Sequence, residues 1–230
     1  MVKGSGLVAT AFMKLFGGDE NIIIFASGVS NSNEIKQLAF DRERILLESV
    51  ISSLEHEKLI YFSTCSINDP DLSKTPYILH KLAMEKLVQK CNSYNIFRVP
   101  QLVGKSANPH TLTNYLYTKI INGEELTIWK KAKRYLIDVE DVVLLANFFI
   151  RDEKYRNQVM NLIMVQSIFS HELVSHLEKI ANKKAQYKMI DAGGDYEISL
   201  LTCHKALEAL GKKIMTKDAY LESVLKKYYG

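Results

Sequence analysis

The distribution of apolar residues predicts strands alternating with helices over the first hundred residues of the chain. Short apolar runs at 21–26, 58–63 and 96–100 are typical of buried strands, and another short strand precedes the first glycines. Periodic segments at 7–16, 34–54 and 77–91 predict helices between these strands, and the first helix should end at the Gly17-Gly18 pair. Strands that alternate with helices in this way are typical of a parallel, doubly wound α/β sheet.

The pattern is less regular beyond residue 104. Helices are predicted at 112–122, 139–151, 170–181 and 200–210, with short strands at 126–129 and 161–165. We therefore expect residues 1–104 to form a Rossmann-like cofactor-binding core. Residues 105–230 should supply the remaining core elements and a small C-terminal substrate lobe, interleaved with the core as one structural unit.

One face of the helix predicted at 34–54 is apolar or small. Its members are Leu38, Ile45, Leu46, Ser49, Val50 and Ser53.

Composition places the chain in the ordinary globular range, with 47% hydrophobic and 24% charged residues among 230. The net charge of +4 comes from scattered basic residues, which argues against a nucleic-acid surface. Cys65, Cys91 and Cys203 are odd in number and widely spaced, as in proteins of the reducing cytoplasm, where we expect this one. The histidines and cysteines show no metal-ligand spacing, so no metal site is expected. The first apolar run, 22–26, is too short to cross a bilayer, and no membrane association is expected.

A glycine-rich turn lies between the first predicted strand and helix. The segment Gly4-Ser5-Gly6-Leu7-Val8-Ala9 matches the pattern G-x-G-x-x-A, which allows a pyrophosphate to approach the N-terminus of a helix. A dinucleotide fold normally carries an acidic residue about 20 positions further on, where it binds the ribose hydroxyls. In this chain that position falls within Ile22-Ile23-Ile24, which contains no acid.

Tyr77 and Lys81 are four positions apart on a predicted helix, so their side chains share a face. A nearby ammonium stabilises a phenolate and makes tyrosine a better proton donor and acceptor. The pair Tyr115 and Lys119 has the same spacing, so spacing alone does not identify a site. Only the first pair follows a strand that ends in a hydroxyl residue, Thr64, and we interpret the second pair as structural.

Taken in order, these motifs resemble the extended short-chain dehydrogenases/reductases, in the group of NAD-dependent epimerases and dehydratases that act on nucleotide sugars. The Gly-rich turn, the strand end Phe62-Ser63-Thr64 and the Tyr77–Lys81 pair all match in sequence order. Two later segments match in altered form, at 98–104 and 134–141. The resemblance covers nearly the whole chain.

The resemblance implies NAD or NADP as cofactor, a nucleotide-sugar substrate and the following site residues. Thr64, Tyr77 and Lys81 would be catalytic. The cofactor would contact Gly4, Ser5, Gly6, Leu7, Val8, Ala26, Ser27, Gly28, Tyr77, Lys81, Val99 and Pro100. The substrate would contact Thr64, Cys65, Ser66, Gln101 and Arg134, with Arg134 on the diphosphate.

Departures from the family pattern narrow the expected chemistry. The segment 22–28 resembles the family's fourth strand and its loop, so the region around the second strand, which holds the adenosine ribose, is shortened or absent. Family dehydratases have an Asp-Glu pair where this chain has Cys65 and Ser66, which disfavours dehydration. Gln101 replaces the usual Asn, and Asp138 replaces the usual His for no reason visible in the sequence.

Two hypotheses follow. The first is an NAD(P)-dependent oxidoreductase or epimerase that reduces a keto sugar or epimerises a nucleotide sugar in carbohydrate biosynthesis. The alternative is a catalytically weakened protein of the same fold that binds nucleotide sugars or has a regulatory role. Because family members often pair through the helices that correspond to 34–54 and 77–91, we also expect a homodimer.

Overall fold

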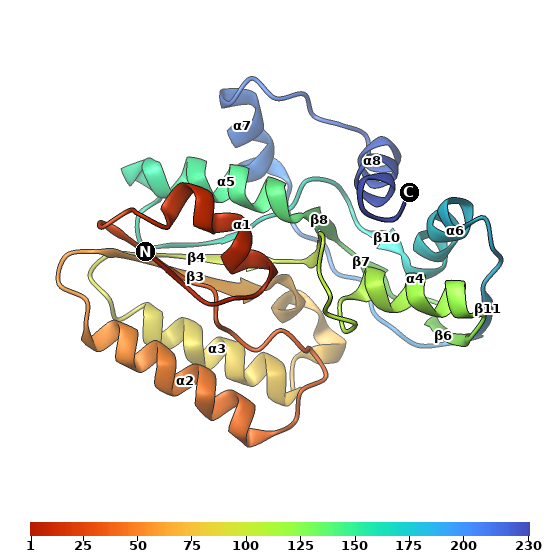
Figure 1. Cartoon of the computed structure of the whole chain (residues 1–230), viewed down its shortest axis with the longest axis horizontal. Coiled ribbons are helices and arrows are strands. Elements are labelled where there is room, and N and C mark those ends of the chain that lie inside the picture. The colour runs from red at the N-terminus through yellow and green to blue at the C-terminus, as the bar shows by residue number, and fades with distance from the viewer. The chain divides into compact units, whose positions relative to one another are not determined.

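Five parallel strands form the central sheet, in the order β1-β2-β3-β4-β9 (Figure 1). They are β1 (Val2–Lys3), β2 (Ile22–Phe25), β3 (Lys58–Thr64), β4 (Tyr94–Val99) and β9 (Gln158–Asn161). The computed structural model describes all residues from 1 to 230. The predicted parallel α/β sheet is confirmed, and β1 forms one of its edges.

Helices cover both faces of this sheet. In Figure 1, α1 (Leu7–Phe16) and α5 (Val139–Arg151) lie on one face, while α2 (Gln37–Ser52) and α3 (Pro76–Val88) lie on the other. Every residue of β3 is buried, as expected for the central strand of a doubly wound sheet. Phe12 of α1 packs on Phe62, and Leu47 and Met84 from the opposite helices pack against the other face.

The strand order reveals where the fold is reduced. The connections through α1 and α2 move in the same direction across the sheet but place their helices on opposite faces, so the two crossovers have opposite hands. Parallel crossovers are right-handed in about 98% of cases. The β1–α1–β2 connection therefore differs in hand from the α2 and α3 connections that follow it. Such a direct connection is what remains when strand–helix units between β1 and β2 are absent. The structure therefore agrees with the shortened adenosine-binding region inferred from the sequence.

The chain divides into two units, each described separately. Unit 1 comprises Met1–Ile67, Leu72–Val99 and Val139–Leu162 and holds the five-stranded sheet. Unit 2 comprises Asn68–Asp71, Pro100–Asp138 and Ile163–Gly230. Residues 139–162 thus return the chain to the sheet after the first part of unit 2, so the two units are interleaved in sequence.

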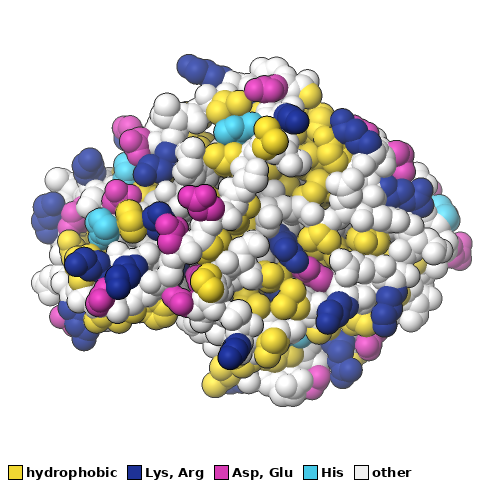
Figure 2. All heavy atoms as spheres, turned by 180° about the vertical axis from the view of Figure 1, so that it is seen from behind, with side chains coloured by type: hydrophobic (Ala, Val, Ile, Leu, Met, Phe, Trp, Pro, Cys, Tyr) yellow, Lys and Arg dark blue, Asp and Glu magenta, His cyan; other side chains and the backbone are white.

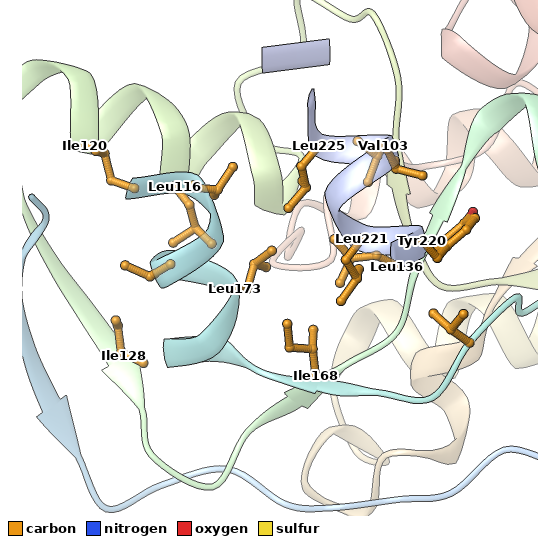
Figure 3. Packing of buried hydrophobic residues seen from close by; sticks show 14 of the residues in the cluster. Val103, Leu116, Ile120, Ile128, Leu136, Ile168, Leu173, Tyr220, Leu221 and Leu225 are labelled. Atoms are coloured by element: carbon orange, nitrogen blue, oxygen red, sulfur yellow. The ribbon is translucent and has the colours of Figure 1, made fainter. Parts of the chain in front are cut away.

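Unit 2 has its own hydrophobic core, built mainly by three helices (Figure 3). These are α4 (Leu112–Asn122), α6 (Ser170–Ala181) and α8 (Lys217–Tyr229), and Leu116, Leu173 and Leu221 meet between them. Three two-stranded sheets complete the unit: β5 (Gln101–Val103) with β8 (Leu136–Asp138), β6 (Glu125–Trp129) with β11 (Gln186–Ile190), and β7 (Lys133–Arg134) with β10 (Ile168–Phe169). Helix α7 (Leu201–Ala209) also belongs to unit 2.

The structure differs from the sequence pattern at two places. The inward face of α2 is formed by Phe40, Glu43, Leu47 and Val50, whereas Leu38 is 82% exposed and Ile45 is 59% exposed. The helix is turned so that a buried glutamate occupies the interior, which no count of apolar residues anticipates. The strand expected at 161–165 lies instead at 158–161.

The exposed charges are mixed in sign. Over the face shown in Figure 2, Lys and Arg side chains alternate with Asp and Glu. None of the helices combines the length and the apolar character that crossing a bilayer requires.

Candidate active site

Tyr77 lies in the first turn of α3, at a position fixed by the local sequence. The side chain of Thr75 caps the helix by accepting a hydrogen bond from the amide of Ile78, and Pro76 occupies the first helical position, where its missing N–H costs nothing. Tyr77 is therefore held beside the carboxyl end of β3, and its side chain is only 8% exposed. Lys81 follows one turn later, and its Nζ lies 6.0 Å from the centre of the Tyr77 ring.

The Tyr77 hydroxyl is hydrogen-bonded to the side chain of Thr64, the last residue of β3. The structure thus brings together two of the three residues expected to be catalytic. Burial raises the pKa of Tyr77, Lys81 acts to lower it, Glu43 acts to raise it and the Thr64 hydrogen bond acts to lower it. The net direction is upward, because desolvation and Glu43 outweigh the ammonium that was expected to dominate.

Lys81 is held in a buried network that the sequence did not suggest. Its Nζ donates to Oε1 of Glu43 at 2.9 Å and to the hydroxyl of Tyr61 at 3.2 Å. Tyr61 in turn donates to the same Glu43 oxygen at 2.6 Å. Lys81 is 3% exposed and both partners are fully buried.

The second oxygen of Glu43 is also occupied. It accepts the backbone N–H of Val29 at 2.6 Å and lies 3.0 Å from Nε2 of His80, which must carry the proton because a carboxylate only accepts. Burial alone raises the pKa of Glu43, but the charge of Lys81 and the bonds from His80, Tyr61 and Val29 hold it far below its usual range. Glu43 is therefore a carboxylate, despite lying in the interior.

The glycine-rich turn requires its first glycine. Gly4 has φ +136°, and a Cβ there would lie 2.3 Å from the carbonyl oxygen of Ala26. The turn is therefore packed directly on the chain that leaves β2. Gly6 has nothing within 4 Å of the Cβ position, and it starts α1 without any side-chain cap. The first amides of α1 thus have no side-chain partner at an exposed turn, as a phosphate-binding turn requires.

The other residues expected to contact the cofactor lie near this turn or at the next strand ends. Ser5, Leu7 and Val8 belong to the turn and the start of α1. Ala26, Ser27 and Gly28 follow β2, and the carbonyl of Ser27 accepts a hydrogen bond from Arg42 at 3.0 Å. A Cβ on Gly28 would lie 2.7 Å from Nζ of Lys81, so this loop lies directly against the lysine. Val99 ends β4 in unit 1, whereas Pro100 begins a segment of unit 2.

Cys65 and Ser66 follow Thr64 in a short 3₁₀ helix, η1 (Cys65–Asn68). Cys65 is fully buried, and its Sγ donates to the carbonyl of Arg98 at 3.1 Å, which favours a packing role for the thiol. The amide of Ser66 donates to the Thr64 hydroxyl at 3.1 Å and helps to fix it.

The remaining substrate residues lie in unit 2. Gln101 begins β5, and Arg134 lies in β7, where its Nη1 donates to the carbonyl of Lys133 at 2.9 Å. No motif in the sequence pointed to Asp69, which is 4% exposed in the same unit. Burial raises the pKa of the Asp69 carboxyl, while the charge of Arg134 acts to lower it. Arg134 therefore interacts electrostatically with the buried carboxyl of Asp69.

The structure gives Asp138, which the sequence left unexplained, hydrogen-bond partners on the C-terminal helix. Its carboxylate accepts hydrogen bonds from Nζ of Lys227 at 2.8 Å and from the hydroxyl of Tyr228 at 2.7 Å, both on α8. The Asp138 amide donates to Tyr220 of the same helix at 2.9 Å. An acid here attaches the C-terminal helix to β8, a requirement that the family's histidine would meet less well.

The second copy of the Tyr-Lys pattern is a surface pair. Tyr115 is 44% exposed, and Lys119 lies over its ring at 5.5 Å while also binding Glu124. No strand-end hydroxyl is bonded to it, in contrast with Tyr77.

Comparisons with known proteins identify the family and agree with the fold. Residues 8–162 match the family model described as NAD dependent epimerase/dehydratase family. No curated protein matches the sequence. Among solved structures, RMD from Pseudomonas aeruginosa complexed with NADPH has a TM-score of 0.70 at 15% identity, covering 98% of this chain and 95% of that one. UDP-glucose 4-epimerase from Thermus thermophilus, in complex with NAD, has a TM-score of 0.68 at 16% identity, covering 96% and 80%. UDP-N-acetylglucosamine 4-epimerase from Bacillus cereus has a TM-score of 0.68 at 17% identity, and the match covers 98% of this chain and 93% of that one.

Proposed function

The chain belongs to the NAD-dependent epimerase/dehydratase family, and from this premise we propose that it is a keto-sugar reductase or an epimerase acting on a nucleotide-activated sugar. The observation that carries the proposal is the hydrogen bond between Tyr77 and Thr64, with Lys81 one helical turn away. These groups are a proton donor, a second hydroxyl for the same oxygen and a buried cation, the set that carbonyl chemistry requires.

In this proposal the three side chains act on one substrate oxygen. Tyr77 transfers a proton to or from that oxygen, and Thr64 donates a hydrogen bond that fixes its position. Lys81 supplies positive charge and an N–H for the ribose next to the reacting ring. A nicotinamide, when bound, supplies or accepts the hydride. Because these donors are held rigidly in a buried site, they need little reorganisation as negative charge develops on the oxygen.

Dehydration is not part of the proposal. Cys65 is buried with its thiol on a backbone carbonyl, and Ser66 is 9% exposed and carries no acid. Elimination of water needs an acid and a base next to the reacting carbons. Neither residue can supply them, which leaves reduction and epimerisation.

We propose NAD or NADP as the cofactor, held mainly at its nicotinamide and pyrophosphate. The exposed turn at Gly4–Gly6, with the uncapped start of α1, suits a pyrophosphate. The loop 26–28 and Lys81 suit the nicotinamide ribose. The adenosine end fits less well, since β1 is an edge strand and no neighbouring strand offers an acid for its ribose. This predicts weak discrimination between the two cofactors.

The substrate diphosphate is assigned to Arg134, because a guanidinium makes paired hydrogen bonds with phosphate oxygens. Gln101 offers an amide for the sugar or the nucleotide. Asp69, in the electrostatic environment of Arg134, would help to orient the guanidinium.

A second candidate is a nucleotide-sugar-binding or regulatory protein without catalysis. The edge position of β1 favours it, because a protein that cannot hold the adenosine ribose loses cofactor affinity. The buried Tyr77, Thr64 and Lys81 favour the enzyme.

We also propose a homodimer formed through the outer faces of α2 and α3. Leu38 and Ile45 on α2 and Leu79 on α3 are 82%, 59% and 56% exposed, so two neighbouring helices present apolar side chains to solvent. A second copy of the chain, with the same apolar surface, would bury them.

The test is a cofactor and substrate panel. The purified protein is titrated calorimetrically with NADH and NADPH, then assayed with nucleotide 4-keto sugars and with UDP-sugar epimer pairs. The enzyme hypothesis expects cofactor binding and turnover of at least one substrate class. Nucleotide-sugar binding without cofactor binding or turnover would favour the second candidate and overturn the first.

A further inference from the structure

Glu43 is a fully buried carboxylate that contacts three separate elements of unit 1. It accepts hydrogen bonds from Tyr61 on β3, from His80 and Lys81 on α3, and from the Val29 amide in the loop after β2. The four bonds occupy both oxygens, so no acceptor site remains for another ligand. His80 is further held by stacking on Phe40 of α2, with ring centres 4.7 Å apart.

The same network fixes the lysine. An ammonium has three N–H donors, and Lys81 uses one on Glu43 and one on Tyr61. One donor therefore remains for a ligand, and its direction is set by the other two. A lysine without such partners would lose the rotamer entropy of a long side chain each time it bound a ligand.

The carboxylate also fixes the loop that lies against the lysine. Val29 donates to Glu43 at 2.6 Å, and Gly28 lies so close to the ion pair that a Cβ there would be 2.9 Å from Oε1. One carboxylate thus sets the relative positions of Lys81 and of the loop 26–29, the two parts assigned to the nicotinamide ribose.

A structural role alone is a poor explanation for this carboxylate. Replacing a buried ion pair by well-packed apolar residues is often neutral or stabilising, because charges are costly to remove from water. The buried charge at position 43 therefore has a better explanation in the function of Lys81 than in the stability of the fold.

We propose that Glu43 is a positioning residue of the nicotinamide site, which presets Lys81 and the loop 26–29 for the cofactor ribose. This inference rests on the proposed function. It assigns Glu43 no contact with substrate or cofactor, and it makes Tyr61 the second support of the lysine.

The charge of Glu43 should also influence the pH dependence of the reaction. The groups facing Tyr77 are Lys81 on its own helix, Glu43 on α2, and Thr64 and Tyr61 on β3. Glu43 acts to raise the pKa of Tyr77, and Lys81 acts to lower it. Removing the charge of Glu43 should therefore lower the pKa of Tyr77. The basic limb of the pH–rate profile should move to lower pH.

The experiment compares Glu43→Gln with Glu85→Gln. Glu85 is a matched control, since it lies one turn beyond Lys81, is 3% exposed and forms an ion pair with the half-buried Arg98 without bonding to the lysine. NADH binding is followed by fluorescence titration, and kcat and KM are measured across pH. Losing one charged hydrogen bond weakens an interaction by about 10- to 150-fold. We expect NADH affinity to fall within this range in Glu43→Gln, and both affinity and pH profile to stay near wild type in Glu85→Gln.

Further variants keep the test decisive. If Glu43→Gln does not fold, Tyr61→Phe provides a second test, because it removes one of the two hydrogen-bond partners of Lys81 and should also weaken NADH binding. Glu43→Asp keeps the charge and should bind NADH more tightly than Glu43→Gln. Wild-type NADH affinity with an unshifted pH profile in a folded Glu43→Gln would overturn the proposal, and so would wild-type NADH affinity in Tyr61→Phe. Absence of NADH and NADPH binding by the wild type would instead refute the proposed function itself.

Discussion

Substituting Gly4 by alanine tests whether the first turn is built as described. At φ +136° the backbone is in a region that residues with a side chain avoid, at a cost of about 1–3 kcal/mol. The added Cβ would also lie 2.3 Å from the Ala26 carbonyl oxygen, and backbone cannot move aside as cheaply as a flexible side chain. We therefore expect a loss at or above the upper end of that range. For a chain of 230 residues about 3 kcal/mol corresponds to a fall in Tm of roughly 6–12 °C.

The assay is thermal and urea unfolding followed by circular dichroism, with Gly6→Ala as the matched control. Gly6 lies two residues away, has no atom within 4 Å of its Cβ position and has a negative φ, so alanine there should change stability by less than about 1 kcal/mol. Equal stability of the two variants would refute the close packing of the turn on the chain leaving β2.

Three further predictions concern the buried charges. The pKa of Glu43 lies below its ordinary value of 4.5, so the contribution of its charge to stability is complete above that pH and is lost as the pH falls. The urea midpoint of the wild type should therefore drop more steeply below about pH 4.5 than the midpoint of Glu43→Gln. Parallel curves for the two proteins would contradict this. Asp138→Asn should lower the free energy of unfolding by about 1.5–3 kcal/mol, because the charged bonds to Lys227 and Tyr228 are lost, and Lys227→Met should then add little in the double variant. Arg98→Lys should cost about 1.5–3 kcal/mol, since an ammonium cannot reproduce the two parallel bonds to Glu85; a smaller loss would show that the pair contributes little.

The parts of the fold that follow from local sequence were predictable. Apolar runs indicated β2 and β3, because fully buried parallel strands leave a continuous hydrophobic signal. The Thr75-Pro76 start of α3 and the spacing of Tyr77 and Lys81 are local too, so the relation of these side chains could be derived without a structure.

The orientation of α2 could not be derived in this way. Its sequence offers an apolar face containing Leu38 and Ile45, yet these residues are exposed and Glu43 is buried. Glu43 shares the inward face with Phe40, Leu47 and Val50, and its partners Lys81, Tyr61 and His80 lie 18 to 38 residues away in the chain. Local periodicity contains no information about such partners.

Helix α8 was also missed, along with β11 and several two- and three-residue strands. Its sequence, from Lys217 to Tyr229, is rich in lysine and tyrosine, and only Tyr220, Leu221, Val224 and Leu225 are buried. The helix packs against α6 and is bonded to Asp138, so its stability comes largely from tertiary contacts. The same contacts explain why an aspartate stands at position 138.

The most direct test of the central claim compares Tyr77→Phe with Tyr115→Phe. Both tyrosines have lysine four residues later, but only Tyr77 is buried and bonded to Thr64. Oxidation of NADH or NADPH by a nucleotide 4-keto sugar, and interconversion of UDP-sugar epimers, are measured for both variants and the wild type. Loss of a positioned proton donor lowers the rate by about 10²–10⁴-fold, so Tyr77→Phe should lose turnover by this factor while still binding cofactor. Tyr115→Phe should match the wild type. Equal turnover in the two variants, or none in the wild type, would contradict the account.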